Sequence, residues 1–232
     1  MDFFIILVLT IAGCFVLKKP LKKYSWAFYI VALALDVLFI TGACYALPKP
    51  VWSVLYLLVQ KCTLPLALFT VVMFIGVFPK DSKVRQALQP IRGELSVLAW
   101  LLCLAHVTVY LMSYAPRVLS GGLISTSVIV SLVLALVILV LLVVLGVTSF
   151  KTVKRAMNTA AWKKVQLLAY PFWLLVYVHL MLMLAPSALG GGQAAITSVI
   201  VYTIVFGAYA VLRPYAFLRA KNAAPLTTGA DN

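Results

Sequence analysis

Seven long apolar runs dominate this sequence of 232 residues and restrict the folds that are open to it. The runs are 2–17, 25–46, 51–78, 94–115, 123–149, 165–187 and 193–212. An α-helix needs roughly 20 apolar residues to cross a bilayer, and in lipid the backbone of each crossing segment must satisfy its own polar groups. We therefore predict an all-α, polytopic transmembrane bundle of about seven spans. The first run is short for a span.

The composition leaves little room for anything else. Hydrophobic residues make up 65% of the chain and charged residues 10%, against about half and a quarter in a soluble domain. No folded extramembrane domain fits between the runs. The glycines at 190–192 lie outside any strand–helix context, so no dinucleotide-binding loop is predicted. Any flavin or nicotinamide domain that serves this chain is expected on another protein.

The Lys and Arg residues are concentrated in alternate loops, as membrane topology predicts. Of 19 Lys and Arg residues, 16 fall in one set of alternate loops, while Lys49 and Arg117 occupy the opposite set. The positive-inside rule places the N-terminus outside and the C-terminus in the cytoplasm. The net charge of +14 is accounted for by these loops, and a nucleic-acid partner is not expected. The basic loop at 150–164 could also dock an anionic electron donor.

The N-terminal segment raises a processing question. Ile11-Ala12-Gly13-Cys14 is similar to a lipoprotein cleavage box, but Lys residues follow it and none precedes it. A signal peptide has the opposite polarity, so we expect a retained first helix. Residues 1–24 form this extra helix and a basic loop, 25–215 the main bundle, and 216–232 a short cytoplasmic tail. The four cysteines lie inside apolar runs and are interpreted as small buried side chains.

Both histidines of the chain lie inside predicted spans. His106 follows Arg92 by 14 residues and His179 follows Lys164 by 15, and both helices run outward. Both imidazoles are therefore expected roughly 21–23 Å from the inner edge. Two neutral imidazoles at one depth on different helices are suited to be the axial ligands of a haem iron. The alternative is that each one hydrogen-bonds locally within the bundle.

Two segments resemble the ferric-reductase-like transmembrane family. AWLLCLAHVTVY (99–110) resembles its haem helix, and WKKVQLLAY (162–170), with His179 beyond it, looks like its W-x-x-x-H-x-x-x-Y helix. Thr148-Ser149, at the end of the fifth apolar run, also fits the family pattern. The resemblance covers about residues 50–215. It is strongest to the haem-binding membrane subunit of the bacterial periplasmic methionine sulfoxide reductase system, and more distant to the NADPH oxidases.

Gln166 departs from that family pattern. It stands 13 residues before His179, where the family carries an inner His. On the helix that carries His106, the residue at the same depth as Gln166 is near Arg92. An amide is a poor ligand for haem iron. The resemblance therefore implies one haem b, held by His106 and His179 as metal ligands, with the inner site missing or differently ligated.

Two charged residues inside spans are further candidates. Lys61 could pair with a haem propionate, as the family's arginine in this region implies, or it could extend toward the outer surface. Asp36 could relay protons or contact a quinone, or it could be a neutral acid bonded to a neighbouring helix. An ion pair between Asp36 and Lys61 is a further alternative.

The expected function is transfer of electrons through haem b, from a cytoplasmic flavoprotein or quinol to an extracytoplasmic acceptor or reductase partner. Quinone or flavin bound at the inner side could bridge the missing haem. We expect a multi-pass protein of a bacterial cell membrane. Two rivals stay open, namely a transporter or channel that uses Asp36 and Lys61, and a redox-inactive scaffold or assembly subunit of the same fold.

Overall fold

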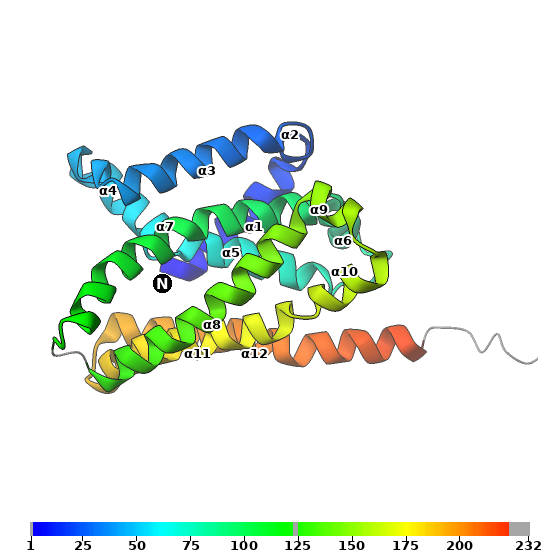
Figure 1. Cartoon of the computed structure of the whole chain (residues 1–232). Coiled ribbons are helices and arrows are strands. Elements are labelled where there is room, and N and C mark those ends of the chain that lie inside the picture. Colours follow the sequence, from blue (N-terminus) through cyan, green and yellow to red (C-terminus); the bar gives the residue numbers. More distant parts are fainter. Residues whose placement is uncertain (1, 123–124, 223–232) are drawn as a thin grey trace, which may run out of the picture.

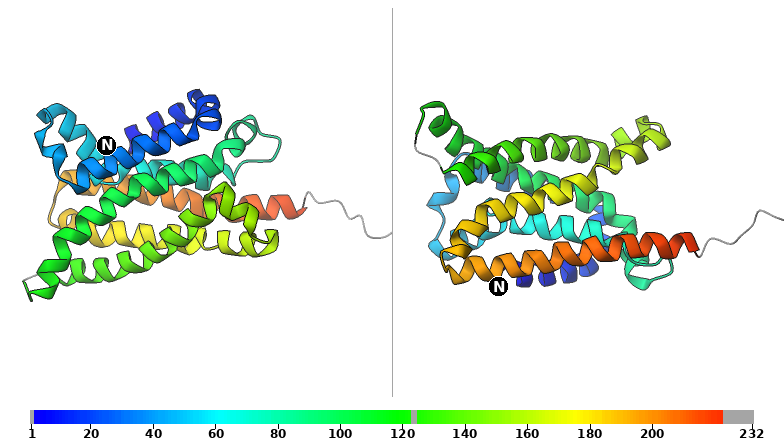
Figure 2. Two further views of the ribbon diagram at one scale, coloured as in Figure 1. Left: turned by 45° about the horizontal axis from the view of Figure 1, so that its top comes forward. Right: turned by 90° about the horizontal axis from the view of Figure 1, so that it is seen from below.

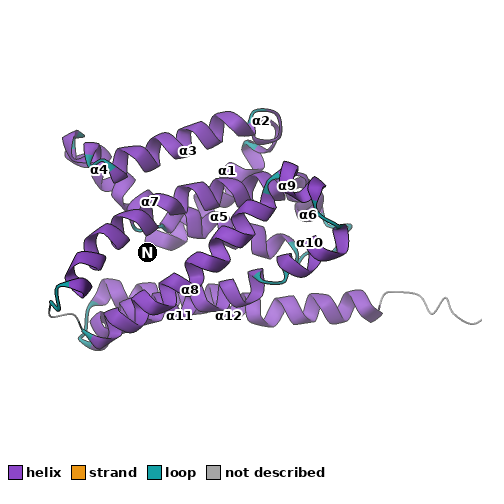
Figure 3. Cartoon of the chain, in the orientation of Figure 1, coloured by secondary structure: helices purple, strands orange, loops and turns teal. Residues whose placement is uncertain are grey.

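The computed structural model describes residues 2–122 and 125–222, and within these ranges the chain forms helices and no strands (Figure 3). The elements are α1 (Asp2–Val16), α2 (Lys18–Lys23), α3 (Ser25–Ile40), η1 (Ala43–Ala46), α4 (Lys49–Leu55), η2 (Tyr56–Gln60), α5 (Thr63–Ile75), α6 (Lys83–Leu88), η3 (Gln89–Ile91), α7 (Arg92–Leu119), α8 (Thr126–Ser149), α9 (Lys151–Ala156), α10 (Thr159–Gln166), α11 (Ala169–Leu189) and α12 (Gln193–Asn222). The predicted all-α class is confirmed.

Four helical stretches in the described ranges are long and apolar enough to cross a membrane: Lys83–Leu119, Thr126–Ser149, Thr159–Leu189 and Gln193–Asn222. The bent pair Lys49–Gln60 and Thr63–Ile75 makes a fifth if it counts as one span. Helices α1 and α3 are apolar but shorter, with 15 and 16 residues. Each predicted apolar run thus contains a helix, and four or five of them meet the length that a bilayer requires.

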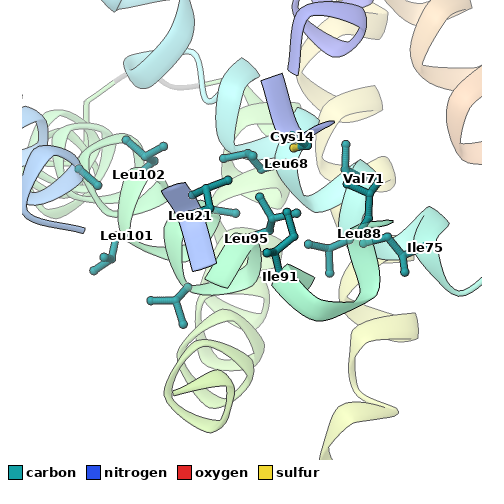
Figure 4. Packing of buried hydrophobic residues seen from close by; sticks show 14 residues of the cluster. Cys14, Leu21, Leu68, Val71, Ile75, Leu88, Ile91, Leu95, Leu101 and Leu102 are labelled. Atoms are coloured by element: carbon teal, nitrogen blue, oxygen red, sulfur yellow. The ribbon is translucent and has the colours of Figure 1, made fainter. Parts of the chain in front are cut away.

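Helix α7 is the centre of the bundle. It packs against α3, α5 and α8, while α11 lies between α8 and α12, and α1 packs on α5 (Figure 1). Both views of Figure 2 show α11 and α12 side by side. One buried cluster joins α5 and α7 to the N-terminal helices, with Leu95, Ile91 and Ile75 almost without solvent exposure (Figure 4). This packing holds the N-terminal half of α7 in place.

The apolar run at 51–78 is interrupted rather than continuous. Helix η2 ends at Gln60, Cys62 has a φ of 58°, and the helices on the two sides meet with a bend of 43°. Pro65 supplies a physical reason, because it has no N–H for the carbonyl of Lys61 and its ring would clash with that carbonyl in a straight helix. The bend removes the carbonyls just before it from the regular hydrogen-bond ladder.

The basic segments gather at one end of the molecule. Helices α2, α6, α9 and α10 and the C-terminal part of α12 lie together at the right of Figure 1. There Glu94, which is 3% exposed, pairs with Lys151 at 2.8 Å and Lys22 at 3.5 Å. This end is called the basic end below. Helix α12 runs on to Asn222, so the predicted tail begins within it, and residues 223–232 lie outside the described part of the chain.

Candidate functional site

His106 is oriented by the helix break. The residue is half-buried on α7, and its Nδ1 lies 2.7 Å from the main-chain oxygen of Gln60. A carbonyl oxygen can only accept, so the contact requires that Nδ1 carries the proton. The lone pair of the ring is then on Nε2, the atom that a metal would bind. Tyr110, one turn further along α7, lies against the imidazole with 4.8 Å between ring centroids.

His179 has a matching arrangement on α11. Its Nδ1 lies 2.9 Å from the hydroxyl of Ser131 and 3.3 Å from the carbonyl oxygen of the same residue. Ser131 belongs to α8 and is 1% exposed. The carbonyl accepts only, which again favours a proton on Nδ1 and a lone pair on Nε2. No described residue forms a hydrogen bond with Nε2 of either histidine.

Helix α8 contacts both α7 and α11, the two helices that carry the histidines. Cys103 of α7 and Phe172 of α11 share one cluster with Leu142 of α8. His106 follows Cys103 by three residues and His179 follows Phe172 by seven.

The described donors near this site are two imidazoles and no larger group of metal ligands. In the described ranges no three His, Cys, Asp or Glu side chains are grouped to hold an ion. A bis-histidine haem needs only two ligands, each a neutral imidazole whose other nitrogen is fixed by a hydrogen bond. His106 and His179 each have an Nδ1 atom held by a hydrogen bond, and no described residue bonds their Nε2 atoms.

Asp36 and Lys61 lie near His106 but do not pair in the described structure. Oδ1 of Asp36, on α3, accepts a hydrogen bond from the backbone N–H of Ala105 at 3.2 Å, and its buried Oδ2 has no partner. Lys61 is exposed in the helix break, with Nζ 5.4 Å from the ring centroid of Tyr56. Asp36 therefore ties α3 to α7 next to His106. Lys61 comes directly after Gln60, whose carbonyl orients the imidazole of His106.

Cys62 and Cys103 lie together at this site, and no sequence pattern predicts this contact. The sulfurs of Cys62 and Cys103 are 3.5 Å apart, although 41 positions separate them. Cys62 follows Lys61 in the break, and Cys103 lies one turn before His106. Neither is part of a C-x-x-C motif. Only the packing of the break against α7 brings them into contact.

Gln166 and Arg92 share a cavity nearer the basic end. The cavity has a volume of about 60 Å³ and is lined from five helices, including α7, α8 and α11. Gln166 donates through Nε2 to the hydroxyl of Thr148 at 3.1 Å, and Trp162 donates to the carbonyl of Thr148 at 2.9 Å. The Thr148 segment thus fixes Gln166, and Arg92 lies on the same cavity, as the helical spacing predicts.

The chain is similar to a protein of a spirochaete bacterium. An uncharacterized protein of Treponema pallidum (strain Nichols) is 34% identical over 200 residues, which are 85% of this chain and 55% of the relative. The chain thus spans about half the length of the curated relative that it matches. No protein-family model matches the chain, and no solved structure does.

Proposed function

We propose that this chain is a haem b membrane subunit of the ferric-reductase-like type. It passes electrons from a cytoplasmic flavoprotein or quinol to an acceptor or reductase partner outside the membrane. His106 and His179 hold the iron. The observation that carries the proposal is that both imidazoles donate from Nδ1 to another helix and leave Nε2 open.

The topology belongs to the same proposal. All seven apolar runs cross the membrane, with the N-terminus outside and the basic end in the cytoplasm. The gathering of α2, α6, α9 and α10 at one end supports this orientation, because cytoplasmic loops are rich in Lys and Arg. The two histidines then lie in the outer half, beyond the level of Cys103 and Phe172.

The residues of the site have separate tasks. Haem supplies one-electron chemistry when it is bound. The carbonyl of Gln60 and the hydroxyl of Ser131 fix the tautomer of each ring and turn it for ligation. Asp36 holds α3 against the backbone of α7 at Ala105. Lys61 is exposed within reach of an anionic group such as a propionate, and its long stem lets it move there.

A visible spectrum of the purified full-length protein tests the proposal. The reduced protein should show the sharp bands of six-coordinate, low-spin haem b. His106→Ala and His179→Ala should each abolish these bands, because one ligand cannot hold the iron low-spin. Tyr177→Phe on α11 is the control, because its hydroxyl contacts Thr203 of α12 and not the site.

The outcomes separate this function from its rivals. Low-spin haem that persists in both histidine variants refutes the ligand pair. A protein that folds but binds no haem in the presence of excess haemin supports the scaffold or transporter alternatives. The transporter alternative needs Asp36 and Lys61 to act together, and in the described structure Asp36 contacts α7 instead.

A further inference from the structure

A surface groove lies between the first turn of α11 and the C-terminal half of α12. Its volume is about 330 Å³, and it is lined by Tyr170 of α11 and by Tyr209, Ala210, Arg213, Pro214 and Phe217 of α12. Phe217 is 63% exposed and Tyr170 38%, so the groove opens on the outside of the bundle. A volume above roughly 300 Å³ is in the range of small-molecule sites.

Arg213 is the one charged side chain among these lining residues, and two neighbouring helices hold it in place. Its Nε and Nη2 donate to the hydroxyl of Tyr170 at 3.0 and 2.7 Å, and its Nη1 donates to the carbonyl of Gly76 at 3.3 Å. These bonds use three of the five N–H groups of a guanidinium. Two N–H groups therefore remain for a ligand, on a side chain that is fixed by α11 and by the end of α5.

No described carboxylate neutralises the charge of Arg213. In the described ranges both ion pairs go to Glu94, which binds Lys22 and Lys151. Arg213 is half-buried, and a charge that is partly removed from water is costly unless it is paired. An anion at the two remaining N–H groups offsets this cost through charge-assisted hydrogen bonds.

The depth of Arg213 along α12 matches the phosphate level of a bilayer. Arg213 follows Gln193, the first residue of α12, by 20 positions, which places it about 30 Å along the helix. The hydrocarbon core is about 30 Å thick, so Arg213 lies at the edge of that core nearest the basic end. Tyr209 and Ala210 lie about one turn deeper, at the level of acyl chains. This depth rests on the topology proposed above and not on the haem.

We propose that the groove binds an anionic phospholipid, with its phosphate on Arg213 and one acyl chain along Tyr209 and Ala210. Phosphate oxygens accept from the two remaining N–H groups of the guanidinium. The acyl chain covers the apolar walls of the groove. Basic sites between helices at the cytoplasmic side of a membrane are suited to anionic head groups.

Other ligands match only a part of the groove. Inorganic phosphate fits Arg213 but leaves the apolar walls uncovered. A neutral quinone covers the walls but leaves the charge of Arg213 unpaired. A flavin nucleotide brings a phosphate, but the polar groups of its ring would be buried against Ala210, Pro214 and Phe217, whose side chains form no hydrogen bonds.

The bound lipid stabilises a junction of three helices. Arg213 of α12 bonds to Tyr170 of α11 and to Gly76 at the end of α5, so a ligand that fixes its guanidinium strengthens all of these contacts. Only the folded chain forms this site, and a ligand that binds only the folded state raises the free energy of unfolding. Phosphatidylglycerol should therefore raise the unfolding temperature of the purified protein.

Native mass spectrometry of the full-length protein in detergent, after removal of bound lipid, tests the site. Dioleoyl-phosphatidylglycerol should bind with a lower apparent Kd than dioleoyl-phosphatidylethanolamine, which has no net charge. Arg213→Gln removes the positive charge, so the Kd for phosphatidylglycerol should rise about ten- to a hundredfold.

Ala210→Phe tests the acyl chain separately from the charge. The new ring fills the groove and leaves Arg213 in place, and Ala210 is exposed, so this variant should fold. Displacing about two methylene groups of the chain should raise the Kd for phosphatidylglycerol about tenfold. Thermal unfolding checks that both variants are folded.

Arg219→Gln is the matched control. It removes the same charge from the same helix, but Arg219 does not line the groove and its guanidinium lies 6.0 Å from the ring centroid of Tyr215. General attraction of an anionic lipid by one basic residue is worth about 1 kcal/mol. The control should therefore raise the Kd by about fivefold at most.

Four results overturn the proposal. They are equal affinity for the two lipids, a Kd in Arg213→Gln no higher than in Arg219→Gln, an unchanged Kd in Ala210→Phe, and displacement of the lipid by excess inorganic phosphate or by FMN. Displacement by phosphate would show a plain anion site, and displacement by FMN a flavin site. If Arg213→Gln does not fold, Ala210→Phe and the comparison of the two lipids decide the question.

Failure of the haem function would give a different result. His106→Ala should lose haem and still bind phosphatidylglycerol as the unmodified protein does. Selective lipid binding by a protein that never takes up haem would refute the function proposed above and leave the lipid site standing. Low-spin haem in a protein without lipid selectivity would do the reverse.

Discussion

The imidazole of His106 donates from Nδ1 to the main-chain oxygen of Gln60 at 2.7 Å, across the break that separates η2 from α5. Pro65 breaks this helix because it cannot donate to the carbonyl of Lys61. In an unbroken helix the carbonyl of Gln60 would accept from Leu64 instead. Pro65, three residues after the bend at Cys62, thus contributes to the orientation of a histidine on another helix.

Pro65→Ala should therefore weaken haem binding without touching either ligand. With an N–H restored at 65, the helix can continue and withdraw the Gln60 carbonyl from His106. Loss of a hydrogen bond that orients a metal ligand typically lowers affinity about 10- to 100-fold. Haem transfer to apomyoglobin measures the change. Pro214→Ala, in the interior of α12, is the control, and equal transfer rates in the two variants would show that the break does not orient His106.

Ser131→Ala should have a smaller effect at His179. It removes the hydroxyl 2.9 Å from Nδ1 but leaves the Ser131 carbonyl, at 3.3 Å, as an acceptor. We expect a loss of about 0.5–1.5 kcal/mol in haem binding, measured by the same transfer assay. Ser198→Ala is the comparison, because that hydroxyl bonds only within α12, to Ala194. A loss as large as that of His179→Ala would mean that the serine itself is a ligand.

The haem content should be one per chain. Gln166 and Arg92 stand on the cavity near the basic end, and neither side chain is a good ligand for haem iron. Gln166→His alone should not add a second haem, because Arg92 offers no second ligand. The pyridine haemochrome assay against protein concentration measures the ratio. A ratio near two in the unmodified protein would show that an unusual ligand is present.

Gly146→Ala should destabilise the fold by overpacking. The new methyl group would lie within 2.2 Å of Trp100, on a helix that is packed against α7, and overpacking of this kind costs about 1–3 kcal/mol. Thermal unfolding in detergent measures it. Gly207→Ala, with no atom within 4 Å of its added Cβ, should be neutral or gain up to about 1 kcal/mol. In a Trp100→Ala background the cost at 146 should shrink, and full additivity would contradict the contact.

Reporter fusions measure the orientation of the chain in the membrane. A reporter at the C-terminus should be active in the cytoplasm, and one inserted in the turn at 187–195 should be active outside. The reason is the concentration of 16 of 19 basic residues in one set of loops. Both reporters on the same side would refute the seven-span topology.

The sequence alone determined the helical class and the location of the helices. Lipid imposes a minimum length of apolar sequence and requires each span to satisfy its own backbone, so composition and run length are sufficient evidence. Loop charges likewise predicted that the basic segments share one end, where Figure 1 shows them. The helical repeat also predicted that Arg92 and Gln166 share a level, and both line one cavity.

The tertiary structure decided which groups meet. Nothing in the local sequence of Cys62 and Cys103, of Gln60 and His106, or of Ser131 and His179 predicts that they touch. In a membrane helix nearly every face is apolar, because lipid and the protein interior favour the same residues. The apolar pattern therefore does not show which face contacts another helix. Those contacts depend on how α5, α7, α8 and α11 pack, and on the bend at Cys62 that exposes one backbone carbonyl to a histidine.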